Sequence, residues 1–335
     1  MGKRRRLVPL TILLVMVLVA SVFTMGCAKS QPKETEKKIK VAAVFPGSIQ
    51  DLAWNQDGYT VLMKLKDELK LDVSYQENVS QSEVKDVLRN YAREGYDFII
   101  GHDLNFTDPV AEVAPEFPKV MFGISGGYKS GANFASVTGT NWESAYLAGA
   151  LAGLLTKSNK IGILTSSDST VAKTMGKAFE QGAQVYNPKA KATRTFTGSW
   201  NDSVKGKELT KAMIRDGVDV VFTNAGQSSM GGLEAAKEGG ILAIAAPNDL
   251  WQVAPDTIVT SAISSSGAML RNLVEMYVKK TFEGKVYVMG VKSGVEDLTP
   301  YHNFDSKLSK DIKDKVAKVR QDLIDGKVTK PTLDK

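Results

Sequence analysis

The chain has 335 residues, 43% of them hydrophobic and 24% charged, which is the balance of a globular protein with a sizeable core. Its length exceeds that of a typical single domain, so we expect two domains. The formal net charge is +6, but without the first 26 residues 39 basic and 37 acidic residues remain, and a net charge of +2 argues against a nucleic-acid-binding surface.

The N-terminal segment has the pattern of an export signal. Cationic "MGKRRR" precedes an uncharged apolar run, which ends at "TMGC" with Cys27, the only cysteine in the chain. A cysteine at this place is typical of a bacterial lipoprotein, so we predict a signal peptide at 1–26, lipidation of Cys27 and a polar tether at 27–39. The protein would then be exported and lipid-anchored to the cell membrane. The alternative is an uncleaved N-terminal membrane helix.

From Lys40 onward, short apolar runs alternate with amphipathic stretches. The expected elements, in chain order, are a strand at 40–45, a helix at 55–69, a strand at 71–77, a helix at 82–95 and a strand at 96–103. This βαβαβ order predicts a parallel sheet with helices on both faces.

The same series recurs about 120 residues later, since Ile161 follows Val41 by 120 positions. The matching segments are 160–166, 192–198, 213–226 and 239–249. We therefore predict the α/β class, with two doubly wound parallel-sheet domains in tandem. The small-residue stretch "NWESAYLAGALAGLL" (141–155) is expected to be a core helix of the second domain, because it is short for a membrane span and contains Glu143.

Ligands of open parallel sheets gather at the carboxyl ends of the strands, and the loops expected there contain aromatic and polar residues. Trp54 and Trp200 each precede an asparagine in such a loop. Aromatic faces stack on flat conjugated ligands, and carboxylates accept hydrogen bonds from ring N–H groups or sugar hydroxyls. The further candidates in these loops are Asp51, Asp103, Phe106, Asn224 and Asp249.

The inventory for catalysis is poor. The two histidines are His102 and His302, no thiol remains beyond Cys27, and the sequence has no phosphate-binding glycine motif and no metal-spaced cluster. His102 beside Asp103 would suit an acid–base pair, but with no nucleophile nearby we interpret the two residues as polar loop residues that bond to backbone or ligand. We therefore expect no enzyme activity, no catalytic residue, no metal and no cofactor.

Four blocks, in order, resemble the basic membrane protein family of ABC-transporter substrate-binding lipoproteins, which includes purine nucleoside receptors. They are "DLAWNQDGY" (51–59), "NWESAYLAGALAG" (141–153), residues 198–240 and "PNDLWQVAPDTIVTSAI" (247–263). The resemblance implies the type I periplasmic-binding fold: two lobes, a cleft, and three hinge crossings near 139–141, 260–263 and 285–290. The first lobe would comprise 40–140 plus 264–285, and the second 141–263 plus 286–335.

The resemblance also implies roles for the site residues. Trp54 and Trp200 take the places of two phenylalanines that sandwich a purine base, Asp249 that of the ribose-binding aspartate, and Asp51 and Asn55 that of the base-side loop. The full set of expected ligand-binding residues is Asp51, Trp54, Asn55, Asp103, Phe106, Ser125, Trp200, Asn224, Gly226, Asp249 and Ser264.

One departure concerns Ser264, which stands where nucleoside-binding relatives have a lysine that helps hold the ribose. The absence of this lysine favours a free purine base as ligand, whereas the presence of Asp249 favours a ligand with a ribose. We take a purine nucleoside as the expected ligand and a free base as the alternative.

The expected function is capture of the ligand outside the cytoplasm by a monomeric receptor and delivery to an ABC permease and its ATPase. A sugar receptor of the same fold is a second possibility, although the strand-end loops contain no arginine. A nucleoside hydrolase would require a cluster of metal-binding aspartates or a strong base. A sensor or adhesin that uses the same fold without transport remains open.

Overall fold

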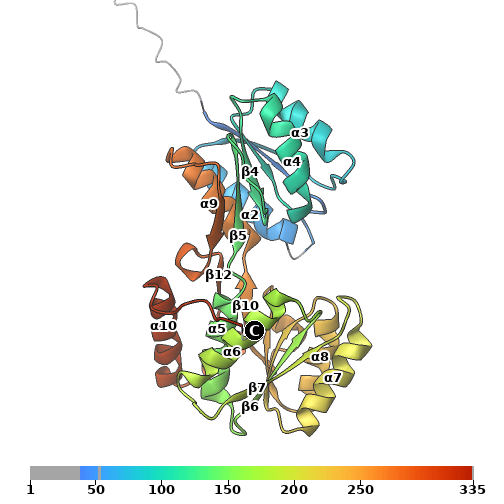
Figure 1. The fold of residues 1–335 in the computed structure, drawn as a ribbon, viewed down its shortest axis with the longest axis vertical. Helices are drawn as coiled ribbons and strands as arrows, with labels where there is room; N and C mark the ends of the chain where they lie inside the picture. The colour runs from blue at the N-terminus through green and yellow to red at the C-terminus, as the bar shows by residue number, and fades with distance from the viewer. Residues whose placement is uncertain (1–37, 52–53, 334–335) are drawn as a thin grey trace, which may run out of the picture. The chain divides into compact units, whose positions relative to one another are not determined.

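The computed structural model describes residues 38–51 and 54–333, and the residues from Ile39 onward form one compact unit. Cys27 and the predicted signal peptide lie outside the described residues. Two six-stranded sheets, each flanked by helices, confirm the expected pair of doubly wound α/β lobes (Figure 1).

The first sheet has the order β11-β5-β4-β3-β1-β2, and its neighbouring strands run parallel. Its strands are β1 (Lys40–Val44), β2 (Asp72–Gln76), β3 (Phe98–Gly101), β4 (Met121–Ser125), β5 (Phe134–Gly139) and β11 (Val286–Met289).

Side chains of β1 alternate between the two faces of this sheet, as the pleat requires. Val41 and Ala43 join the core beneath α2 (Trp54–Glu68) and α9 (Ser266–Val278). Ala42 and Val44 join the core beneath α3 (Val84–Arg93) and α4 (Thr107–Val113). Both faces are therefore buried, which is why the strand reads as a continuous apolar run.

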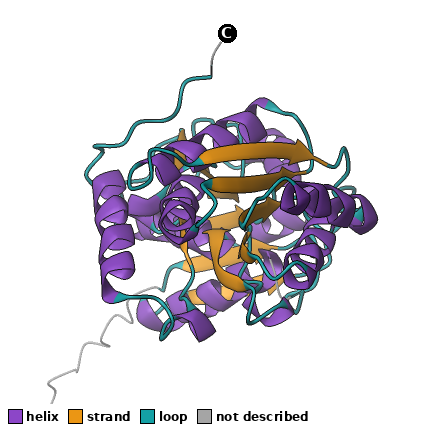
Figure 2. Ribbon diagram, turned by 90° about the horizontal axis from the view of Figure 1, so that it is seen from below, coloured by secondary structure: helices purple, strands orange, loops and turns teal. Residues whose placement is uncertain are grey.

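The second sheet has the order β12-β10-β9-β8-β6-β7, parallel except for the antiparallel edge strand β12. Its strands are β6 (Lys160–Thr165), β7 (Lys191–Phe196), β8 (Val220–Asn224), β9 (Leu242–Ala245), β10 (Ile258–Ser264) and β12 (Glu296–Leu298). Helices cover both faces (Figures 1 and 2): α5 (Glu143–Leu155), α6 (Thr170–Gln184) and α10 (Lys310–Ile324) on one, α7 (Ser203–Arg215) and α8 (Ser228–Glu238) on the other.

The small-residue stretch forms α5, and its middle is fully buried, as expected for a core helix. Glycine allows it to pack directly on α6: a Cβ at Gly149 would lie 2.0 Å from the carbonyl oxygen of Phe179, and one at Gly153 would lie 2.3 Å from that of Ala183. The two helices can pack this closely only because glycine, which has no side chain, stands at both positions.

The chain crosses between the lobes three times within the described residues. The first crossing joins β5 to α5, the second joins β10 to α9 at Ser265, and the third joins β11 to β12 through residues 290–295. The lobe boundary expected at 286 is wrong, because residues 286–289 form β11 and pair with β5 in the first sheet. The sequence of a short apolar strand does not indicate which of two sheets it joins.

The crossings meet at a buried carboxylate. Glu296 is fully buried at the start of β12 and accepts hydrogen bonds from the backbone N–H groups of Asn141 and Ser144, on the far side of the first crossing. Its strand neighbour is Ser264, at the second crossing. Glu143 mirrors this arrangement, because its Oε2 accepts the N–H of Val291 at 2.7 Å.

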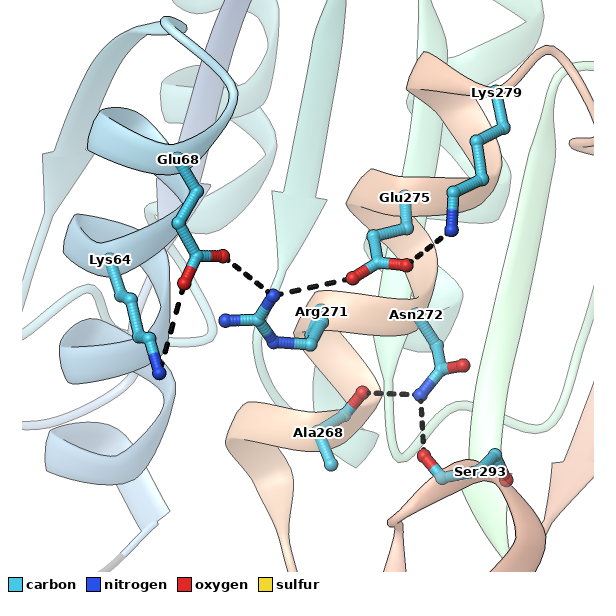
Figure 3. A network of polar contacts seen from close by, with 8 residues as sticks. All are labelled: Lys64, Glu68, Ala268, Arg271, Asn272, Glu275, Lys279 and Ser293. Carbon is cyan, nitrogen blue, oxygen red and sulfur yellow. Dashed lines mark hydrogen bonds and ion pairs between the residues drawn. The ribbon is translucent and has the colours of Figure 1, made fainter.

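Polar contacts also join α9 to its neighbours in the first lobe (Figure 3). Arg271 bonds to Glu68 of α2 at 2.9 Å and to Glu275 at 3.3 Å, while Asn272 donates to the carbonyl of Ser293 in the third crossing. The ion pairs are partly exposed to solvent and contribute little stability. The Asn272 bond fixes α9 to the hinge segment.

We predict that Glu296→Ala lowers the free energy of unfolding by about 2–4 kcal/mol, because it leaves two buried N–H groups without an acceptor. Urea unfolding measures the change. Glu283→Ala is the control, since Glu283 is exposed and pairs only with Lys285 among the contacts described, and it should change stability by less than about 0.5 kcal/mol. Equal effects of the two variants would contradict the role of Glu296.

A pH dependence follows from the same burial. Desolvation raises the pKa of the Glu296 carboxyl above its ordinary value, and the charge of Glu143 adds to this rise. The folded state therefore binds a proton more tightly than the unfolded state, and this stabilising contribution is lost as pH rises through the folded pKa. Between the ordinary carboxyl range and neutral pH, the wild type should lose more stability than Glu296→Gln. Parallel urea titrations at several pH values measure the difference.

Candidate ligand-binding site

Trp54 is the first residue of α2 and stands at the carboxyl edge of the first sheet. The Asp51 carboxylate accepts the N–H groups of Asn55 and Gln56 at 3.1 and 3.0 Å, which caps the first turn of the helix. The half-buried indole donates from Nε1 to the carbonyl of His102 at 2.9 Å, and its ring lies 5.4 Å from the imidazole. Trp54 is thus a fixed aromatic platform.

His102 supports this platform from below. Its imidazole is fully buried, Nε2 lies 3.2 Å from the carbonyl oxygen of Trp54, and Nδ1 lies 3.0 Å from Oγ of Ser125. Burial lowers the pKa of His102 to about 4, so the ring is neutral at pH 7. A carbonyl can only accept, so Nε2 carries the proton and Nδ1 accepts from Ser125. Both nitrogens are engaged with the protein, which favours the interpretation of a structural polar residue.

Asp57 lies one turn after Trp54 and joins α2 to the N-terminus of α9. Its Oδ2 accepts hydrogen bonds from Oγ of Ser265 and the N–H of Gly267, at 2.9 and 2.8 Å, and lies 3.2 Å from Oγ of Ser266. Ser266 also lies 2.7 Å from the Trp54 carbonyl oxygen. Carboxylates are favourable at helix N-termini, so the platform is connected to the segment that follows the second crossing.

A cavity of about 260 Å³ adjoins this connection. It is lined by residues from both lobes, six of the eight polar: Asp57, Asn248, Asp249, Ser264, Ser265 and Thr299, together with Pro247 and Ile263. Two of the residues expected to bind ligand, Asp249 and Ser264, are thus brought together, with the Asp57 carboxylate opposite. Carboxylates and hydroxyls in one cavity suit a ligand that presents several hydroxyl groups.

Trp200 occupies the loop between β7 and α7 and is 57% exposed. Its carbonyl accepts the N–H of Ser228 at 3.1 Å. Gly226, at φ +58°, makes room for it, because a Cβ there would lie 3.1 Å from the indole ring. Asn224 is half-buried, and its Nδ2 lies 3.3 Å from the sulfur of Met175. Gly226 and Trp200 therefore form one local unit of the second lobe.

Buried Asn55 donates from Nδ2 to Asp51 at 2.7 Å, while its Oδ1 finds no hydrogen-bond donor among the residues that the structure describes. A buried acceptor without a partner is unfavourable by about 1–3 kcal/mol.

Two expectations about this site change. The expected exposure of Phe106 to the cleft is wrong: Phe106 ends the 3-10 helix η1 (Leu104–Phe106), and its ring is 1% exposed in the first-lobe core. Ser125 is fully buried and bonds to His102, so it supports the platform without facing solvent. Asp103 remains a predicted ligand residue; its Oδ1 also caps η1 by accepting the N–H of Asn105 at 2.7 Å.

In the described part of the chain, no group of three or more His, Cys, Asp or Glu side chains could hold a metal ion. No helix among residues 38–51 and 54–333 is long and apolar enough to cross a membrane.

Residues 38–330 match the family described as ABC transporter substrate-binding protein, PnrA-like. The chain belongs to this family. Its members are solute-binding receptors that work outside the cytoplasm with a permease and an ATPase, and the family is not an enzyme class.

Two curated relatives carry ligand names. An ABC transporter nucleoside-binding protein of Lactococcus lactis is 29% identical, with 94% of this chain and 97% of the relative aligned. A purine-binding protein of Brucella abortus is 25% identical, with 85% of this chain and 82% of the relative aligned. A solute-binding protein of Conexibacter woesei matches the fold with a TM-score of 0.73, at 23% identity over 88% of this chain and 98% of that structure.

Sequence reasoning about this family member missed Asp57 and His302. Asp57 follows Trp54 by one helical turn, so spacing alone could have placed the two on one face of α2. Its partners are about 208 residues away in the chain, and no local pattern reveals them. The sequence assigns no role to His302, yet its Nε2 lies 2.8 Å from Oδ2 of Asp249.

We predict that Gly58→Ala destabilises the protein by about 1–3 kcal/mol, although alanine is the better helix former. A Cβ at this position would lie 2.2 Å from Nε2 of His102. Urea unfolding provides the measurement, and Thr60→Ala, on the exposed side of the same helix, should have little effect.

The cause can be separated from a general defect of α2. Adding His102→Ala to Gly58→Ala should produce less destabilisation than the sum of the two single changes, because the clash is gone. Strict additivity would contradict the packing argument.

Proposed function

We propose that this receptor captures a purine nucleoside, with the base against Trp54 and the ribose toward the cavity that contains Asp249. The observation that carries the proposal is the continuity between the Trp54 platform and the polar cavity. Trp54 and Asp57 lie one turn apart in α2, and Asp57 lines the cavity with Asp249 and Ser264. A ligand that combines a flat ring with neighbouring hydroxyls matches both parts.

The second lobe supplies the other face of the base. Exposed Trp200 would stack on the side opposite Trp54, as the family resemblance implies. Asn55 and Asp51, which are hydrogen-bonded to each other, would face the polar edge of the base. The two faces of the base and its hydrogen-bonding edge would then all be recognised. Closure of the cleft would be a population shift driven by ligand contacts that require both lobes.

A free purine base is the second candidate. It is favoured by Ser264, a short hydroxyl where nucleoside-binding relatives have a lysine. A base would use the platform but leave the cavity of about 260 Å³ to water. The names of the two curated relatives support the purine class and include both a nucleoside-binding and a purine-binding protein.

We further propose that the receptor acts as a monomer anchored to the membrane by a lipid on Cys27, and that it delivers its ligand to the permease. The cationic and apolar N-terminal sequence before this cysteine supports the anchor.

Titration calorimetry on the full-length chain, unfolded and refolded to remove carried-over ligand, tests the ligand class. The panel is guanosine, adenosine, inosine, adenine, guanine and ribose. Tight binding of nucleosides is expected. Binding of the bases alone would overturn the nucleoside in favour of the second candidate, and silence across the panel would overturn the purine class.

Trp54→Ala should lower ligand affinity by roughly fivefold to 150-fold, since stacking of a base on an aromatic ring contributes about 1–3 kcal/mol. Trp54→Phe retains a stacking face and should bind much more tightly than Trp54→Ala. Trp142 is the contrast: it is 6% exposed in the second-lobe core, so Trp142→Ala should lower the melting temperature more than Trp54→Ala does. Unchanged affinity in Trp54→Ala would exclude the platform as the ligand site.

A further inference from the structure

Asp249 is held by a histidine from a distant part of the chain. Its Oδ2 lies 2.8 Å from Nε2 of His302, which is 53 residues away in the sequence. Asp249 follows β9, whereas His302 begins the 3-10 helix η5 (His302–Phe304) after β12. Their side chains are 36% and 21% exposed, so the contact sits at the margin of the cavity.

The imidazole of His302 is itself fixed. It stacks on the indole of Trp251 at a centroid distance of 4.6 Å and an interplanar angle of 17°. Two residues further on, Phe304 is buried in the second-lobe core. The backbone of His302 has φ +45°, a conformation that most residues avoid, so the surrounding structure imposes this placement.

The two loops that meet here are tied to the same residue of β10. Oγ of Ser261 accepts the N–H of Leu250 at 3.1 Å, and the carbonyl of Ser261 accepts the N–H of Thr299 at 2.8 Å. Leu250 adjoins Asp249, and Thr299 lines the cavity. The distance between Asp249 and His302 is thereby set by the sheet, not by the two side chains alone.

This arrangement determines how the Asp249 carboxylate faces the cavity. A free aspartate rotates about two side-chain bonds, and its ordering on binding would oppose affinity. With Oδ2 on His302 and the N–H of Trp251 donating to Oδ1 at 3.4 Å, the carboxylate plane is set before ligand arrives, and His302 supplies the shorter of the two contacts. As a surface pair the contact adds little to folding stability, so its main consequence is orientation.

We propose that His302 is a positioning residue for ligand selection: it fixes Asp249 so that the receptor favours ligands with neighbouring hydroxyls over the bare ring. The inference rests on the proposed nucleoside function, because Asp249, the residue that His302 positions, is the one proposed to bind the ribose. His302 acts through Asp249 and stacks on Trp251.

The test compares two variants at residue 302, both of which must adopt the same positive φ as His302. His302→Phe retains a ring for Trp251 but has no donor, whereas His302→Gln retains an N–H donor. The full-length chain is titrated with inosine and with the base hypoxanthine, and melting temperatures are recorded. His302→Phe should weaken inosine binding roughly fivefold to tenfold, which is the size of one ordinary hydrogen bond, and leave the binding of the base unaffected.

His302→Gln should restore inosine affinity to within about threefold of the wild type, because it can still donate to the carboxylate. In an Asp249→Asn background, His302→Phe should add little further loss, since the residue that it positions has changed. A purely structural role would instead lower the melting temperature and weaken both ligands alike.

The outcomes separate this inference from the function on which it rests. If the wild type binds inosine and His302→Phe binds it equally well, the role of His302 is overturned and the proposed function stands. An equal loss for inosine and hypoxanthine overturns the role as well. If the wild type binds neither ligand, the proposed function and the role of His302 are overturned together.

Discussion

The buried carboxylate of Glu296 is the interaction on which the arrangement of the two lobes depends. It lies where all three crossings converge and accepts two backbone N–H groups from the far side of the first crossing. Even Gly139 fits this constraint, because a Cβ there would lie 2.9 Å from Oε1 of Glu296. A charge in such a place is favourable only if its acceptor sites are used, so the hinge segments are held in one register.

This register reaches the ligand site through the second crossing. Ser264 pairs with Glu296 and lines the cavity, and Ser265 next to it donates to Asp57. Asp57 belongs to the same turn of α2 as Trp54. The hinge, the cavity and the aromatic platform are thus consecutive parts of one hydrogen-bonded structure.

Much of the fold could be predicted from the sequence, because parallel strands buried on both faces appear as apolar runs and their order follows from the helices between them. The positions of the ligand loops followed from the rule that strand carboxyl ends share an edge.

The errors arose where long-range packing decides. Phe106 was expected in the cleft because its loop lies there, yet η1 turns its ring into the core. The boundary at 286 failed because β11 pairs with β5, a partner about 150 residues earlier. The sequence around His102 looks like an ordinary polar loop. The glycine at position 58 of α2 is needed because the imidazole of His102 packs against the helix there, and this contact could not be predicted from the local sequence. Such contacts are set by shape and not by local pattern.

The two tryptophans differ in a way that bears on how the cleft recognises its ligand. Trp54 is held by a hydrogen bond from its indole, by the imidazole below it and by Gly126, where a Cβ would lie 3.4 Å from the ring. Trp200 is 57% exposed and is seated through its backbone on Ser228. A base that stacks first on Trp54 meets a surface that is already ordered, so little conformational entropy is lost. Under the proposed function, Trp200 would be ordered only on closure, where contacts with the ligand would offset the loss of entropy. Trp54 would then select the ring, Asp249 the hydroxyls, and Trp200 would close over a ligand that satisfies both.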